Sequence, residues 1–145
     1  MRILIINGPN LSSIGSREPA FYGKQSFESA LITWQKAYPQ CQLTCFQSDE
    51  EGRLVGILQS SKESADGIIL NAGAYTHTSI ALADAVRSLA IPVIEVHISN
   101  IFARETFRKH SYLSTVCRGS ICGLGLDSYR LGIEALLHLK NAQGN

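Results

Sequence analysis

The chain has 145 residues, of which 45% are hydrophobic, and its 13 basic and 12 acidic residues leave a formal net charge of +1. This length and apolar content suit a single domain over residues 1–145 with a substantial core. The balanced charge, with no clustered run of lysine and arginine, argues against a nucleic-acid partner and favours a small ligand.

Apolar segments are short throughout the chain. The run after Met1 and Arg2 is too brief for a signal peptide, and no run reaches transmembrane length, so we expect a cytoplasmic protein with no membrane contact. The cysteine spacings match neither a zinc ribbon nor a redox Cys-x-x-Cys pair, and we expect reduced, mostly buried thiols in strands. These residues are Cys41, Cys45, Cys117 and Cys122.

Short apolar runs alternate with longer amphipathic segments. In chain order, the pattern predicts a strand over 2–7, a helix over 27–38, a strand over 41–46, a helix over 50–61, a strand over 67–71, a helix over 79–89, strands over 92–98 and 116–123, and a helix over 128–139. Helices between strands imply crossover connections and a parallel sheet covered on both faces. We therefore predict an α/β fold, a flavodoxin-like three-layer sandwich with a five-stranded parallel sheet in the order 2-1-3-4-5.

Polar residues follow the first, third and fourth predicted strands. In a parallel sheet of this class, ligands bind beyond the carboxyl ends of the strands. We therefore expect three segments to converge on one edge of the sheet. They are Asn7 and Asn10 with the loop 17–22, residues 71–79, and residues 97–100 with Arg104 and Arg108 behind them.

Arg17 and Tyr22 share the loop after the first strand. A free phenol has a pKa of about 10, so a tyrosine base near pH 7 needs its pKa lowered by roughly three units. A neighbouring guanidinium can supply this stabilisation. Alone, Tyr22 would be an aromatic packed beneath a loop and Arg17 a surface partner of Glu18, but the pair in one loop favours chemistry.

Glu95 and His97 lie two residues apart on the fourth predicted strand. Strand alternation places both side chains on one face, where the carboxylate can orient the imidazole and keep it protonated. The alternative is a structural role for both, as a hydrogen-bonded histidine at a strand end and a carboxylate that anchors the next turn.

Five sequence blocks together resemble type II 3-dehydroquinate dehydratase. They are NGPNL (7–11), REP with YG (17–19 and 22–23), NAGAYTHTS (71–79), EVHISN (95–100) and FRKHSY (107–112). One block alone would be weak evidence, but five in this order are specific. The resemblance implies anti elimination of water from 3-dehydroquinate to give 3-dehydroshikimate, through an enolate and without metal or cofactor, in a homododecamer that is a tetramer of trimers.

The resemblance also implies the catalytic roles. Tyr22 would be the base, with Arg17 lowering its pKa, and His97 would be the general acid beside Glu95. Asn10 would hold a water over the developing enolate oxygen. From the residue alone, Asn10 would be a turn residue after Gly8-Pro9.

The substrate carboxylate would be held by the backbone amides of Ile98 and Ser99, the Ser99 hydroxyl and Asn71. Arg108 would clamp a ring hydroxyl, and Gly73 would allow the backbone to approach closely.

His77 and Asp84 complete the implied binding set. His77 would help to hold hydroxyls, and Asp84 would reach the site of a neighbouring subunit. From the residues alone, His77 could instead assist a helix N-cap, and Asp84 could be a solvated helix carboxylate.

The sequence also bears on other mechanisms and other classes of function. An imine mechanism is rejected because every lysine falls in a loop or on a polar helix surface. His77, His97 and Glu95 could bind a metal, although a strand-borne Glu-x-His is weak evidence. The alternative from another class is a non-catalytic flavodoxin-like small-molecule binding module or an oligomeric scaffold.

Overall fold

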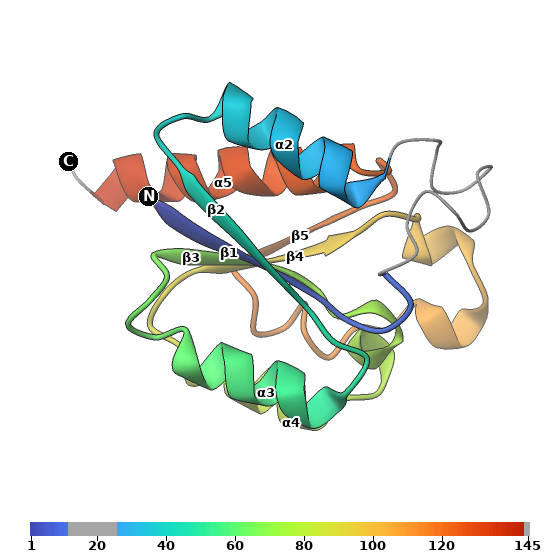
Figure 1. The fold of residues 1–145 in the computed structure, drawn as a ribbon. Coiled ribbons are helices and arrows are strands. Elements are labelled where there is room, and N and C mark those ends of the chain that lie inside the picture. Colours follow the sequence, from blue (N-terminus) through green and yellow to red (C-terminus); the bar gives the residue numbers. More distant parts are fainter. Residues whose placement is uncertain (12–25, 144–145) are drawn as a thin grey trace.

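The computed structural model describes residues 1–11 and 26–143 (Figure 1). Five strands form one sheet in the order β2-β1-β3-β4-β5, and all neighbours are parallel. The strands are β1 (Arg2–Asn7), β2 (Gln42–Gln47), β3 (Gly67–Asn71), β4 (Val93–His97) and β5 (Gly119–Cys122). The predicted flavodoxin-like fold, parallel sheet and strand order are confirmed.

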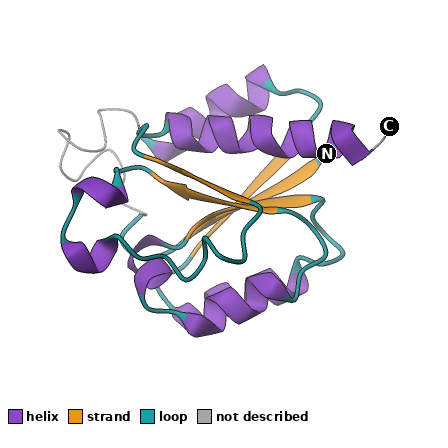
Figure 2. Ribbon diagram, turned by 180° about the vertical axis from the view of Figure 1, so that it is seen from behind, coloured by secondary structure: helices purple, strands orange, loops and turns teal. Residues whose placement is uncertain are grey.

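Helices cover both faces of the sheet (Figures 1 and 2). On one face lie α2 (Phe27–Ala37) and α5 (Asp127–Gln143), and on the other lie α3 (Glu51–Ser60) and α4 (Ile80–Arg87). The side chains of β1 alternate between two separate cores: Ile3 and Ile5 pack beneath α2 and α5, whereas Leu4 and Ile6 pack beneath α3 and α4. This alternation makes the three layers.

Predicted and observed boundaries differ most after β4. The strand predicted over 116–123 begins only at Gly119, because the Val116 and Cys117 N–H groups donate to the Leu113 carbonyl and form a turn. Three short 3₁₀ helices were not predicted: η1 (Gly73–His77), η2 (Ile101–Ala103) and η3 (Thr106–Arg108). All three follow strands at the carboxyl edge, where they shape the candidate site.

The expectation of mostly buried cysteines in strands is partly wrong. All four thiols are free, but only Cys41 is buried, and Cys45 is exposed. Cys45 and Cys122 do lie in strands, whereas Cys41 precedes β2 and Cys117 lies in the turn before β5. The physical reason is that β2 and β5 are the two edge strands, which have a neighbouring strand on one side only. Separately, no helix within residues 1–11 and 26–143 is long and apolar enough to span a bilayer.

Gly8 provides a test of how β1 and β3 are joined at the carboxyl edge. Its N–H donates to the Asn71 carbonyl at 2.7 Å, and a Cβ on Gly8 would lie 2.4 Å from the Ala72 carbonyl oxygen. Because that oxygen belongs to the backbone, Gly8→Ala should lower the free energy of unfolding by about 1–3 kcal/mol. Chemical denaturation at fixed protein concentration measures the change.

The matched control for Gly8→Ala is Gly56→Ala in α3. Gly56 is exposed, and nothing lies within 4 Å of its would-be Cβ, so this change should stabilise the chain by about 0.5–1 kcal/mol. Equal effects of the two substitutions would contradict the close approach of the Gly8 and Ala72 backbones.

Candidate active site

The segments after β1, β3 and β4 meet at the carboxyl edge of the sheet, as the sequence predicts. Asn7 and Asn71 are register partners at the ends of β1 and β3, and both are buried. The Tyr129 hydroxyl, from α5, donates to Asn7 Oδ1 at 2.8 Å and accepts from Asn71 Nδ2 at 2.7 Å. One buried phenol therefore fixes the ends of both strands.

The side chain of Asn71 also holds the turn that follows β3. Its Oδ1 accepts the Gly73 N–H at 3.2 Å, where η1 begins. Gly73 has φ +58°, in the left-handed region, and a Cβ there would lie 3.1 Å from the Pro9 carbonyl oxygen. The Gly73 backbone therefore lies close to the Pro9 backbone, and this contact joins the β1 and β3 loops.

Glu95 and His97 form a buried pair on β4. Strand alternation puts both on one face, and His97 Nε2 lies 2.9 Å from Glu95 Oε1. Because an ionised carboxylate only accepts, Nε2 carries the hydrogen of this bond. Within the described residues, no other hydrogen bond involves the His97 side chain, so Nδ1 is left for a ligand.

Three hydroxyl groups also bond to Glu95, and sequence reasoning missed all of them. Thr76 and Ser111 (2.7 Å) donate to Oε1, and Ser120 (2.7 Å) donates to Oε2. Burial by itself raises the pKa of Glu95, but the hydrogen bonds from His97, Thr76 and Ser111 outweigh burial and hold that pKa below its ordinary value. The available signal was that a carboxylate in a central strand needs donors, and serines and threonines occur in the neighbouring motifs.

His77 lies beside this pair. Its ring stacks on the His97 ring with centroids 6.4 Å apart, and its Nδ1 is 2.7 Å from the His110 carbonyl oxygen. A carbonyl only accepts, so Nδ1 carries the hydrogen and the neutral ring offers Nε2 as an acceptor. Burial lowers the pKa of His77, which favours this neutral form. The cap of α4 is provided by Ser79, whose hydroxyl accepts from the Leu82 N–H.

The residues after β4 turn across the edge of the site. Ile98 is buried and Ser99 is half-buried, and the Ile98 carbonyl accepts the Gly125 N–H at 3.0 Å. Arg108 ends η3, with its Nε 3.1 Å from Glu105 Oε2 and its guanidinium 5.2 Å from the centre of the Phe107 ring. The Arg108 Nε is buried and makes no hydrogen bond of good geometry within the described residues.

Within residues 1–11 and 26–143, Asn10 and Asp84 form hydrogen bonds with residues outside the Glu95 cluster. Asn10 adopts φ 64° and donates its backbone N–H to Asp49 Oδ1 at 3.1 Å. Asp84 is exposed on α4, with Oδ1 2.6 Å from Arg87 Nη1, and no described hydrogen bond or ion pair joins it to the other candidates. Tyr22 and Arg17 lie outside the described residues.

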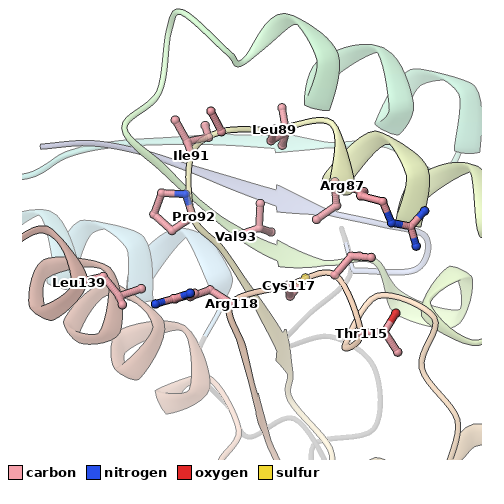
Figure 3. A pocket seen from close by; sticks show the side chains of 12 residues that line it. Arg87, Leu89, Ile91, Pro92, Val93, Thr115, Cys117, Arg118 and Leu139 are labelled. Atoms are coloured by element: carbon pink, nitrogen blue, oxygen red, sulfur yellow. The ribbon is translucent and has the colours of Figure 1, made fainter. Parts of the chain in front are cut away.

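A groove of about 500 Å³ lies at the other end of the sheet (Figure 3). It runs between the end of α4, the turn that precedes β4 and the turn that precedes β5, and Pro92, Val93, Cys117 and Arg118 line part of it. These residues precede β4 and β5 or begin β4, so the groove lies toward the amino ends of these strands. The cluster of buried titratable groups, rather than this groove, marks the candidate active site.

Comparisons with known proteins show the family of this chain. The family model described as Dehydroquinase class II matches residues 1–137. The chain belongs to this family. A 3-dehydroquinate dehydratase of Prochlorococcus marinus is 49% identical over 140 residues, which are 94% of this chain and 96% of the relative. One from an Exiguobacterium species is 50% identical over 143 residues, 97% of this chain and 98% of the relative.

Solved structures include other class II dehydroquinases. The type II dehydroquinase of Butyrivibrio crossotus superposes with a TM-score of 0.89 at 41% identity, covering 94% of this chain and 97% of that one. The fold of this chain is therefore that of the family.

The ionised state of Glu95 predicts how stability depends on pH. The pKa of Glu95 is 4.5 when unperturbed and is lowered to about 2 in the folded chain, so its contribution is present above about pH 5 and is lost as pH falls toward 2. Glu95→Gln should cost about 2–4 kcal/mol of unfolding free energy at pH 7. The difference in unfolding free energy between wild type and Glu95→Gln should become smaller as pH falls from about 5 to 2. Chemical denaturation at a series of pH values measures this difference.

Asp66→Asn is the control for Glu95→Gln, because it removes an exposed carboxylate instead of a buried one. Hydrogen bonds from Arg2 also lower the pKa of Asp66, but that pair is exposed, and its loss should cost about 1 kcal/mol or less at pH 7. If the difference in unfolding free energy between wild type and Glu95→Gln stayed constant from pH 7 to pH 2, Glu95 would not be ionised in the folded chain.

Proposed function

We propose that this chain dehydrates 3-dehydroquinate to 3-dehydroshikimate, a step of the shikimate pathway, with His97 as the general acid and Tyr22 as the base. The observation that carries the proposal is the buried Glu95–His97 pair at the carboxyl edge of the sheet. Family membership supports the reaction, since curated relatives are named 3-dehydroquinate dehydratase.

The reaction needs a base, a stabiliser of the enolate and an acid. The substrate has a ketone, an acidified C–H on the adjacent carbon and a hydroxyl one carbon further on. Removal of the proton gives an enolate, and its collapse expels the hydroxyl as water once that oxygen is protonated. Each of these steps has a candidate group in this chain.

His97 supplies the proton for the departing hydroxyl. Its Nε2 is held by Glu95, so the proton is transferred from Nδ1, the nitrogen left without a described hydrogen bond. The ionised Glu95 stabilises the imidazolium electrostatically and keeps the ring in one orientation. After the transfer, the neutral ring retains the Nε2–H bond and recovers its Nδ1 proton from solvent.

Tyr22 removes the C–H proton, and Arg17 stabilises its phenolate. Anti elimination requires the base and the acid to act on opposite faces of the substrate ring. Asn10 holds a water against the enolate oxygen, and its placement in the loop after β1 is consistent with that task.

The remaining candidates bind the substrate. Its carboxylate is held by the amides of Ile98 and Ser99, the Ser99 hydroxyl and Asn71, whose Nδ2 has a second N–H beyond the bond to Tyr129. The guanidinium of Arg108 clamps a ring hydroxyl.

The neutral His77 accepts from another ring hydroxyl through Nε2. Asp84 acts on a neighbouring subunit, which its exposure on α4 permits, within a homododecamer that is a tetramer of trimers in the cytoplasm.

The direct test is the ultraviolet absorbance of the conjugated product when purified protein meets 3-dehydroquinate. Turnover that persists with chelator and after borohydride treatment supports the metal-free, imine-free dehydratase. Loss with chelator would favour a metal mechanism, and loss after borohydride an imine. Ligand binding without turnover in folded, assembled protein would favour the binding module.

Tyr22→Phe tests the base. If the phenolate removes the proton, kcat should fall by about 10²–10⁴-fold, while affinity for a product-like ligand stays within about tenfold. Steady-state kinetics and calorimetry measure the two quantities. Tyr75→Phe is the matched control, because the Tyr75 hydroxyl donates to the Asp49 carbonyl and is assigned no chemistry. Equal losses of turnover and affinity in Tyr22→Phe would indicate a structural tyrosine.

A further inference from the structure

The Glu95 carboxylate is surrounded by donors from four different segments. Its own strand provides His97, η1 provides Thr76, the turn after η3 provides Ser111, and β5 provides Ser120. The side chain is 1% exposed, so losing a donor from the buried Thr76 or Ser111 leaves a carboxylate oxygen without that partner. A buried carboxylate stays ionised only while such donors are in place.

The two hydroxyls that donate to Oε1 also lie in contact with each other. Thr76 Oγ1 and Ser111 Oγ are 2.8 Å apart, and the Tyr112 N–H donates to the Thr76 carbonyl at 2.9 Å. The same two segments hold the neighbouring imidazole, because the His110 carbonyl accepts from His77 Nδ1. The hydroxyls therefore belong to one structure that orients both histidines.

We propose that Thr76, Ser111 and Ser120 are positioning residues for the dehydration, holding Glu95 fixed and sharing its charge so that His97 keeps its orientation and its acidity. This inference rests on the proposed function. None of the three needs to touch the substrate, since each acts through Glu95.

The sharing of charge has a definite sign. A hydroxyl that donates to the carboxylate disperses its negative charge, so His97 feels less of it and gives up its proton more readily. Loss of one donor makes the carboxylate more basic, so it attracts the proton of the imidazolium more strongly. Among residues 1–11 and 26–143, the other titratable or charged groups near the pair are His77 and Cys117, with Arg108 acting on His77, and changing a hydroxyl alters none of them.

The decisive experiment compares Thr76→Val with Thr76→Ser. Thr76 is fully buried, so valine preserves its shape and removes only the hydroxyl, whereas serine keeps the hydroxyl. In Thr76→Val we expect kcat to fall by about tenfold or more with KM little changed, and the alkaline limb of the kcat–pH profile to move to higher pH. Thr76→Ser should restore both the rate and the limb toward wild type.

A second test variant and a control variant distinguish the loss of a hydrogen bond to Glu95 from a folding defect. Ser120→Ala removes a donor from an exposed residue on the edge strand, where folding is least at risk, and should move the alkaline limb in the same direction. Thr115→Val is the matched control, because the Thr115 hydroxyl donates to the Tyr112 carbonyl and not to Glu95. Its kcat and pH profile should be those of wild type.

The outcomes separate this inference from the proposed function. No turnover in the folded wild-type protein would overturn the proposed function and this assignment with it. Wild-type turnover with an unmoved alkaline limb in both Thr76→Val and Ser120→Ala would overturn the positioning role alone. A rate loss in Thr76→Val that serine fails to restore would likewise indicate a role in packing rather than in holding Glu95.

Discussion

The structure of the site depends on one buried negative charge. A carboxylate out of water is costly unless it is fully hydrogen-bonded, and Glu95 meets this requirement with four donors. These donors come from β4, η1, the turn after η3 and β5. The full set of hydrogen bonds to the carboxylate therefore forms only when distant parts of the chain are assembled. The requirement that stabilises Glu95 therefore also sets the arrangement of the site around it.

A second buried polar group joins the site to the sheet. The Tyr129 hydroxyl bridges Asn7 and Asn71, which are register partners at the ends of β1 and β3. A slip of either strand would leave buried amides unpaired, at a cost of about 1–3 kcal/mol each. Tyr129 also stacks on Trp34 of α2, so the helical layer and the polar edge are fixed by the same side chain.

Periodic features of the sequence were enough to predict the layers and part of the site. Apolar runs located every strand, and strand alternation predicted that Glu95 and His97 share a face. The hydroxyl donors were beyond this reasoning, because Ser111 and Ser120 contact Glu95 only through tertiary structure, as does the bond between Tyr129 and Asn7 across 122 positions. The cysteine prediction failed for a similar reason, since composition does not reveal which strands lie at the edge of a sheet.

In the mechanism that we propose, the Glu95–His97 pair protonates the leaving group. An analogue of 3-dehydroquinate with fluorine in place of the departing hydroxyl tests this role. Fluoride can leave without a proton, so the step no longer needs a general acid. We predict that His97→Ala slows dehydration of 3-dehydroquinate by about 10²–10⁴-fold but slows loss of fluoride far less. Equal losses on the two substrates would contradict the account, because His97 would then be needed for something other than proton donation.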